Sequence, residues 1–313
     1  LGLSLTCFPP GARRMRWRFS RWESTISARC DRLAKIARPE TAVITNIGWC
    51  HLENLKTRDG ILQAKTEIFD HLRENGHIII NGDDDKLSTV GTVHGIKPVH
   101  FGLDEKNEYY ADEIESQGFR GISCRIHTPQ GSFSALIPIP GRHMVYNALA
   151  GTAVGCMYGL TLEQIKQGIE TLQSVSGRFH IIETGKYTVV DDCYNANPDS
   201  MKAALAMFKD FPCKRRFALL GDMLELGDIS RAAHEEVGRQ AVENKVDYLV
   251  TYGEQAKRIA VVAAAKGLPT LHADTYAQAA DALLNKMQPG DALLVKASRG
   301  MALEKVLEIF YKE

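Results

Sequence analysis

The chain has 313 residues, which is enough for two domains that each bury a core of their own. Lysine plus arginine and aspartate plus glutamate balance at 38 each, which excludes a global field that would favour nucleic acid or an anionic membrane surface. No stretch approaches the roughly 18 to 20 apolar residues of a transmembrane helix, and the seven scattered cysteines form no C-x-x-C pair, which argues against a disulfide framework or a zinc site and for the cytoplasm.

The first 36 residues differ from the rest of the chain. They carry eight lysines and arginines against only two acidic residues, Glu23 and Asp31. Such an excess is typical of a targeting peptide or of a disordered basic tail. We therefore treat residues 1–36 as an aberrant segment.

Residues 37–176 predict a first domain with a mostly parallel sheet, helices and a small additional antiparallel sheet. Thr161 is the expected N-cap of its last helix. The predicted strands cover residues 41–47, 77–81, 99–101, 109–114, 123–127 and 132–137, and the predicted helices cover residues 59–72, 141–158 and 162–172.

Residues 177–313 predict a second domain in which strands alternate with helices, so we expect a Rossmann-like, doubly wound parallel sheet. Ligands of such sheets bind at the carboxyl ends of the strands. The predicted strands with assigned limits cover residues 187–191, 216–220, 248–251 and 292–296, and the predicted helices cover residues 199–209, 230–243, 254–266, 276–287 and 301–311.

Four polar side chains of the first domain are candidates for binding a ligand. Asn46 and His51 follow the end of a predicted strand, where they could reach a divalent metal ion or a phosphate. Lys65 lies on the next predicted helix, and a lysine that reacts with CO2 gains a carboxylate able to ligate a metal. Asn147, at the start of a later helix, could pair with an adenine edge. Each feature taken alone is also compatible with ordinary structure.

The most specific motif is the run D-D-C-Y-N-A-N-P, residues 191–198, directly after a predicted strand. Two carboxylates and two amides are more polar groups than a turn requires, and Asp192 could bind ribose hydroxyls. Farther along, Lys296, Ser298 and Arg299 follow the last strand in a combination suited to a carboxylate, although a tight turn would also explain them.

At these motifs the chain resembles the Mur ligases over roughly residues 33–311, and in the loop 191–198 it resembles those that add D-alanyl-D-alanine. The resemblance implies an ATP-dependent, magnesium-dependent amide ligase that acts on a UDP-N-acetylmuramoyl-tripeptide in peptidoglycan synthesis. We expect it to be a monomer. There are two alternatives: a sister ligase that adds another amino acid, and a non-catalytic remnant that binds a nucleotide or a peptide.

The resemblance also implies a role for each candidate residue. His51 and Lys65, the latter as a carbamate, would be catalytic and hold magnesium, and Asn46 would lie near the nucleotide. Asn147 would hold adenine, Arg178 the phosphates and Asp192 the ribose. The residues assigned to substrate are Tyr194, Asn195, Asn197, Lys296, Ser298 and Arg299.

The sequence departs from the family in several places. Met144 stands where the family has an asparagine, and Ala297 stands where it has a glycine. The 313 residues contain no G-x-x-x-x-G-K-[ST] phosphate-binding loop and no UDP-sugar domain. We therefore expect this fragment to be inactive by itself.

Residues 18–30 are interpreted as a frame-shifted copy of family sequence. The family carries E-M-G and G-E-M ahead of strand T-N-I, which is present here at residues 45–47. An offset codon reading of residues 18–30 can restore both missing motifs, and it would explain the excess of arginine. We expect residues 1–30 to pack poorly, because their pattern was not selected for a core. The nucleotide sequence tests this hypothesis.

Overall fold

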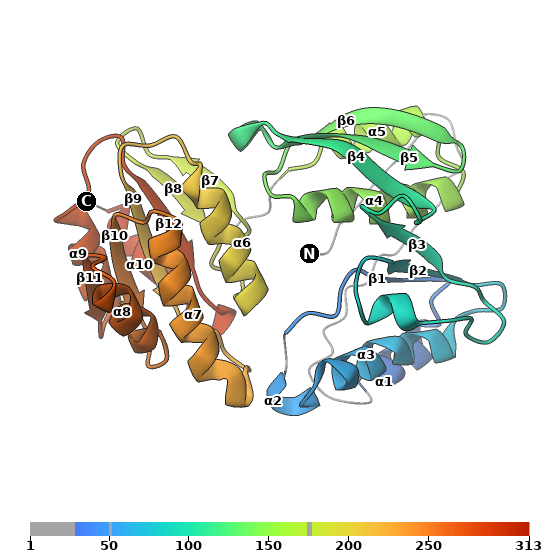
Figure 1. The fold of residues 1–313 in the computed structure, drawn as a ribbon, viewed down its shortest axis with the longest axis horizontal. Helices are drawn as coiled ribbons and strands as arrows, with labels where there is room; N and C mark the ends of the chain where they lie inside the picture. Colours follow the sequence, from blue (N-terminus) through green and yellow to red (C-terminus); the bar gives the residue numbers. More distant parts are fainter. Residues whose placement is uncertain (1–28, 50–51, 174–176, 313) are drawn as a thin grey trace. The chain divides into compact units, whose positions relative to one another are not determined.

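The computed structural model describes residues 29–49, 52–173 and 177–312. The chain forms two compact units that divide between Gln173 and Ser174, close to the domain boundary expected at Gly177. Each unit has its own sheet and its own helices (Figure 1). Across the described part, no helix has the length and apolarity needed to cross a membrane.

The described residues of the first unit form one six-stranded sheet in the order β1-β2-β3-β4-β5-β6. β1 to β4 run parallel, whereas β4, β5 and β6 form an antiparallel meander. β3 and β4 pair only at Phe101 with Tyr109 and at Gly102 with Tyr110, so the expected small antiparallel sheet is continuous with the parallel one. The strands are β1 (Thr41–Ile44), β2 (His77–Asn81), β3 (Val99–Gly102), β4 (Tyr109–Ser116), β5 (Ile122–Thr128) and β6 (Gly131–Ile137).

Helix α4 organises the core of the first unit. It lies against β2 to β6, and it is buried on most sides because its residues are almost all apolar or small. Helix α5 packs on α4 and β6, and Thr161 begins it with a capping box, as predicted. The helices are α1 (Arg29–Ala37), α2 (Leu52–Leu55), α3 (Arg58–Thr66), α4 (His143–Met157) and α5 (Leu162–Glu170), with 3₁₀ helices η1 (Glu67–His71), η2 (Leu87–Thr89) and η3 (Gly118–Arg120).

The amino-terminal helix α1 corrects one expectation. It packs against η1 and α3, and it buries Cys30 and Ala34. Poor packing was expected for residues 1–30, but Cys30 is 4% exposed, so that expectation is wrong at this residue. Residues 18–28 of the proposed frame-shifted stretch lie outside the described residues, and the hypothesis stays a prediction.

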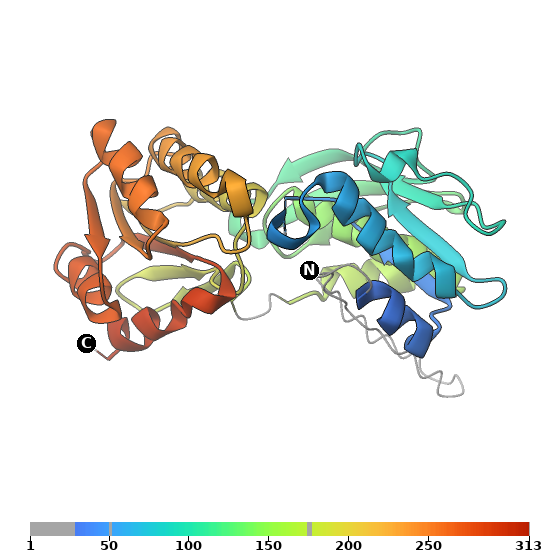
Figure 2. The same ribbon diagram turned by 90° about the horizontal axis from the view of Figure 1, so that it is seen from below.

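The second unit confirms the doubly wound sheet. The described strands have the order β11-β10-β9-β12-β8-β7, with all neighbours parallel except β7 and β8. Helices α6, α7 and α8 cover one face of the sheet, and α9 and α10 cover the other (Figures 1 and 2). The strands are β7 (His180–Glu183), β8 (Thr188–Asp191), β9 (Arg216–Gly221), β10 (Tyr248–Tyr252), β11 (Thr270–Ala273) and β12 (Ala292–Lys296).

The helices of the second unit follow the predicted pattern with some shorter ends. The helix expected at residues 301–311 starts only at Glu304, because Ala302 takes a left-handed conformation with φ of 47° after a 3₁₀ turn. The helices are α6 (Pro198–Lys209), α7 (Ser230–Glu243), α8 (Ala256–Ala265), α9 (Tyr276–Leu284) and α10 (Glu304–Phe310), with 3₁₀ helices η4 (Gly227–Ile229) and η5 (Arg299–Met301).

Candidate functional site

The loops that carry the second unit's motifs meet at one edge of its sheet. β8, β12, β9 and β10 are neighbours and run parallel, so their carboxyl ends lie together. The loops after them begin with Asp192, Ala297, Asp222 and Gly253. The structure therefore brings the D-D-C-Y-N-A-N-P loop and the K-A-S-R turn to the same place, as the sequence predicts.

The two aspartates of this edge hold the first described residues of the second unit. Asp191 accepts a hydrogen bond from the Gly177 nitrogen at 3.1 Å through Oδ2, and Asp192 accepts one from the Phe179 nitrogen at 3.1 Å through Oδ1. The Tyr194 nitrogen donates to the Gly177 carbonyl at 2.8 Å. These three bonds anchor residues 177–179 on the loop that follows β8.

Arg178 lies inside this anchored segment. Its guanidinium carbon stands 4.0 Å from the centre of the Tyr194 ring. A guanidinium stacked in this way is oriented through its face, while its N–H groups point outward in its own plane. The arrangement suits the recognition of phosphate oxygens, which such in-plane donors contact.

The second oxygen of Asp192 is bound by Lys296. The Lys296 Nζ donates to Asp192 Oδ2 at 2.7 Å and to the Asn195 carbonyl at 3.1 Å. Burial raises the pKa of Asp192, and the neighbouring ammonium of Lys296 opposes that rise. Asp192 and Lys296 thus form a nearly buried ion pair at the centre of the predicted site.

Ser298 and Arg299 differ in their surroundings. Ser298 is 4% exposed, accepts a hydrogen bond from the Leu224 nitrogen at 2.9 Å and donates one to the Ala196 carbonyl at 3.3 Å. The Arg299 side chain is 64% exposed and pairs with Glu304 at 3.1 Å. Ser298 therefore joins the loops after β8 and β9, whereas Arg299 faces outward.

The two asparagines of the loop after β8 shape it locally. Asn197 is the N-cap of α6, and its Oδ1 accepts from the Ser200 nitrogen at 2.8 Å. The exposed Asn195 uses its Oδ1 to accept from the Ala196 nitrogen at 2.9 Å. The cap starts α6 immediately after the loop, and this fixes the direction in which the loop ends.

Two further residues brace the loop after β9. Asp222 accepts a hydrogen bond from the Ala256 nitrogen at 2.7 Å, and this ties the loop to the start of α8. His234 is fully buried, accepts from the Met223 nitrogen at 3.0 Å through Nε2 and donates to the Ser230 carbonyl at 2.7 Å through Nδ1. Burial lowers the pKa of His234, which favours the neutral ring. Its two hydrogen bonds connect α7 to the loop after β9.

In the first unit, Lys65 reaches the end of β1. Its Nζ donates to the Asn46 carbonyl at 2.8 Å, so the structure brings these two predicted residues together. His51, the third predicted residue of this group, lies outside the described residues. In the described part of the chain, no cluster of three histidine, cysteine or acidic side chains is arranged to hold a metal ion.

Asn147 is placed on α4 and is 6% exposed. Its Nδ2 lies 3.3 Å from the sulfur of Met144, the residue that departs from the family pattern. A thioether sulfur is a weak acceptor, so this contact is a poor substitute for an amide partner. The Asn147 side chain is therefore held on α4 beside Met144.

The polar residues 81–85, from the last residue of β2 into the loop after it, were not predicted from the sequence. Asn81 donates to the Thr45 carbonyl at 3.0 Å, and Asp84 accepts from the Ile47 nitrogen at 2.7 Å, so both brace the residues around Asn46. The available signal was the run N-G-D-D-D directly after a strand, the same type of signal that identified residues 191–198.

Asp83 of the same loop connects it to α4. Its Oδ2 accepts a hydrogen bond from the Tyr146 hydroxyl at 3.1 Å, and burial together with this carboxylate raises the pKa of Tyr146 to about 12. Tyr146 precedes Asn147 on α4. The loop after β2 therefore links the strand end that carries Asn46 to the helix that carries Asn147.

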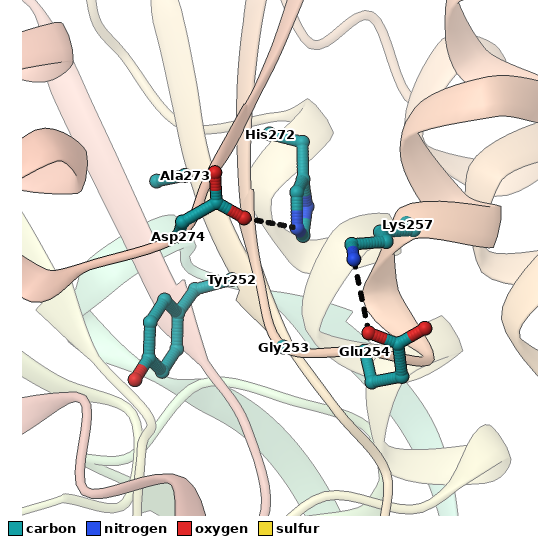
Figure 3. A pocket seen from close by; sticks show the side chains of 7 residues that line it. All are labelled: Tyr252, Gly253, Glu254, Lys257, His272, Ala273 and Asp274. Carbon is teal, nitrogen blue, oxygen red and sulfur yellow. Dashed lines mark hydrogen bonds and ion pairs between the residues drawn. The ribbon is translucent and has the colours of Figure 1, made fainter.

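A small pocket of about 170 Å³ lies at the carboxyl ends of β10 and β11 (Figure 3). Its charged side chains face one another in pairs, with Lys257 Nζ 2.9 Å from Glu254 and His272 Nε2 3.9 Å from Asp274. The pocket shares its edge of the sheet with the site loops. None of the residues predicted to bind a ligand lines it.

Comparison with known protein families places both units. Residues 23–155 match the Mur ligase middle domain, and residues 177–299 match the Mur ligase, glutamate ligase domain. The chain is 35% identical over 283 residues to the UDP-N-acetylmuramoyl-tripeptide–D-alanyl-D-alanine ligase of Bacillus subtilis strain 168, covering 89% of this chain and 60% of that protein. It is 35% identical over 275 residues to the Escherichia coli K12 protein of the same name, covering 87% and 60%.

Solved structures agree with this placement. A crystal structure of MurF from Acinetobacter baumannii superposes with a TM-score of 0.82 at 31% identity, covering 92% of this chain and 64% of that one. MurF from Thermotoga maritima in complex with ADP gives a TM-score of 0.78 at 27% identity, covering 93% and 66%. The chain spans about 60% of the length of the curated relatives it matches. It belongs to the Mur ligase family and carries the family's middle domain and its glutamate ligase domain.

Proposed function

We propose that the chain is the nucleotide- and acceptor-binding part of an ATP-dependent ligase that adds D-alanyl-D-alanine to UDP-N-acetylmuramoyl-tripeptide. The named relatives carry this activity in their names, and one similar structure contains ADP. The observation that carries the proposal is the anchored Arg178, stacked on Tyr194 beside Asp192 at the carboxyl edge of a doubly wound sheet.

The reaction would proceed in two steps. A carboxylate oxygen is a poor leaving group, so the terminal carboxylate of the tripeptide first attacks the γ-phosphorus of ATP and releases ADP. The free amine of D-alanyl-D-alanine then attacks the acyl carbon of the resulting acyl phosphate. The amide bond forms as the nitrogen loses a proton to solvent, and inorganic phosphate leaves with the electrons of the broken C–O bond. The protein contributes by positioning the reactants and by stabilising the charge on phosphate.

The nucleotide is assigned to four of the residues predicted from the sequence. Asn147 and Asn46 of the first unit would contact the nucleotide, while Arg178 would bind phosphate and Asp192 the ribose hydroxyls. Asp192 is suited to this role because it is a carboxylate with 18% of its side chain exposed, and a carboxylate oxygen can accept more than one hydrogen bond.

Magnesium is assigned to His51 and to Lys65 as its carbamate. The Lys65 Nζ stands beside the Asn46 carbonyl, which places it at a strand end braced by the loop after β2. An unmodified ammonium cannot ligate a cation, whereas a carbamate supplies the oxygen donors that Mg²⁺ prefers. When bound, the metal would neutralise part of the charge on phosphate and carboxylate.

The acceptor dipeptide is assigned to the loop after β8 and to the turn after β12. Tyr194, Asn195 and Asn197 supply polar atoms on the first loop, and the exposed guanidinium of Arg299 supplies a cation for the dipeptide carboxylate. A monomeric state and a cytoplasmic location remain predictions.

The test uses a full-length enzyme that joins this chain to the amino-terminal region of a relative. ADP release should require both the UDP-linked tripeptide and D-alanyl-D-alanine, and replacement of the dipeptide by single amino acids should abolish it. Arg178→Met should lower kcat/KM for ATP, whereas Arg239→Met, on the exposed face of α7, should not.

Two outcomes would identify the alternatives. Turnover with a single amino acid in place of the dipeptide would identify a sister ligase. Nucleotide binding without substrate-dependent ADP release by the completed enzyme would indicate a non-catalytic binding protein. The 313-residue polypeptide alone is expected to release no ADP, since its sequence contains no glycine-rich phosphate loop with its lysine.

A further inference from the structure

The charged side chain of Lys296 is buried, which is unusual for a lysine. It is the last residue of β12, which lies between β9 and β8 in the interior of the sheet, and it is 2% exposed. A lysine is almost never fully buried unless its charge is paired. Its surroundings therefore indicate what the residue does.

The Lys296 ammonium contacts two protein oxygens. One is Asp192 Oδ2 at 2.7 Å, and the other is the Asn195 carbonyl at 3.1 Å. An ammonium has three donors, so two are used within the protein, and the side chain exposes only 3% of its surface. In contrast, the Arg299 side chain three residues later is 64% exposed. Of these two cations, Arg299 is the one open to a ligand.

The two partners of Lys296 flank Tyr194 in the loop after β8. Asp192 precedes Tyr194 in the loop, and Asn195 follows it. The other oxygen of Asp192 holds the Phe179 nitrogen at 3.1 Å, directly after Arg178. One buried ammonium thus connects β12 to both chain segments that present the Arg178–Tyr194 stack.

We propose that Lys296 is a positioning residue that acts through Asp192 and the Asn195 carbonyl to hold the Arg178–Tyr194 stack, and that it does not contact the acceptor dipeptide. Its effect on ligation rests on the proposed function, but its effect on Asp192 does not. Removing one partner of a buried ion pair leaves the other charge without compensation, so the two residues should be strongly coupled.

The ionisation of Asp192 gives a readout that loss of packing alone would not move. The charged groups acting on Asp192 are Lys296 from β12 and Asp191 from β8, and burial by itself favours the neutral acid. Among these groups, Lys296 is the cation, and it lowers the pKa of Asp192. Without it, the pKa of Asp192 should move to higher pH, whereas an arginine at the same position should hold it near its original value.

The experiment is a carbon-13 NMR titration of the aspartate carboxyl groups in the 313-residue chain, with Asp192→Asn used to assign the resonance. We expect the Asp192 midpoint to rise in Lys296→Met and to stay close to the parent value in Lys296→Arg. An unchanged midpoint in Lys296→Met would overturn the proposal. If Lys296→Met does not fold, the double variant Asp192→Asn/Lys296→Met decides: recovered folding supports the coupling, and continued unfolding contradicts it.

A kinetic arm tests the absence of a substrate contact. In the full-length enzyme, Lys296→Met should lower kcat or raise KM for ATP, with KM for D-alanyl-D-alanine changed less than threefold. A tenfold or larger rise confined to KM for the dipeptide would show direct contact and refute the positioning role. If the parent enzyme does not ligate at all, the proposed function fails, and the titration still decides the role of Lys296.

Discussion

Replacement of Asn197 separates its structural role from a role in binding substrate. Asn197 caps α6 through two reciprocal hydrogen bonds, from the Ser200 nitrogen to Asn197 Oδ1 at 2.8 Å and from the Asn197 nitrogen to Ser200 Oγ at 3.0 Å. Asn197→Ala removes the first bond and leaves the second, while Pro198 still presets the first helical turn. The start of α6 should therefore be weakened without being lost.

The magnitude follows from the single bond removed. Loss of an N-cap side chain costs about 1 kcal/mol, so the population of frayed α6 should rise about fivefold. Asn197→Asp keeps an oxygen that can accept from Ser200 and adds a negative charge at the helix N-terminus, which the helix dipole favours. Asp should therefore preserve the stability that Ala loses.

Hydrogen exchange measured by mass spectrometry on peptides that cover α6 is the appropriate assay. Tryptophan fluorescence would not report on this helix, because the three tryptophans all precede residue 50. Exchange in α6 should be about fivefold faster in Asn197→Ala and unchanged in Asn197→Asp. Equal exchange in Ala and parent, or equally fast exchange in Asp and Ala, would refute the capping argument.

The same pair of variants tests the substrate role. The Asp variant keeps the acceptor but lacks the two N–H donors of the amide. If the Asn197 amide donates to substrate, Asn197→Asp should lose ligation in the full-length enzyme while α6 remains protected. Normal ligation by Asn197→Asp would show that the residue acts through the helix alone.

Three other predictions follow from the contacts described. In a full-length enzyme, Lys65→Ala should abolish ligation, and added short carboxylates should partly restore it; full activity in Lys65→Ala would contradict the carbamate. Arg215→Met leaves the Asp291 carboxylate, only 1% exposed, without its cation, so urea unfolding should show a loss of about 3 kcal/mol. Arg231→Met removes an exposed ion pair, so it should leave the urea midpoint nearly unchanged. Burial lowers the pKa of His234 from its ordinary 6.5, so the unfolded chain binds a proton at a pH where the folded chain does not, and stability should fall as pH drops below that value. His234→Gln should lessen this fall in thermal unfolding curves recorded from pH 8 to pH 5, and an unchanged slope would show that other groups cause it.

Much of the fold could be predicted because strongly apolar or strongly periodic segments have few alternatives. β2, β12 and α7 have the predicted limits, and Thr161 is the N-cap that was expected. β7 was missed, because none of its four residues is fully buried and it lies at the edge of the sheet, where the apolar signal is weak. The late start of α10 follows the left-handed conformation of Ala302 after η5, which no propensity predicts.

The site was predicted less completely than the fold. Sequence order correctly grouped the loops after β8 and β12, because parallel strands end at a common edge. It could not show which polar groups face inward. Lys296 and Arg299 have similar charges and stand three residues apart, yet one is 2% exposed and the other belongs to an exposed turn. That difference depends on the position of each residue relative to the end of β12, which only the packed structure reveals.

The narrow junction between β3 and β4 has a consequence for how the first unit folds. β4, β5 and β6 follow one another along the chain as two hairpins. In contrast, residues 45–76 separate β1 from β2, the strand with which it pairs. Contacts that are close in sequence form sooner, since they close shorter loops. We expect the meander to form first and α4 to pack against it. The parallel strands would then join the sheet through the two residue pairs between β3 and β4. A newly made chain would then hold a folded meander before its earlier strands find their partners.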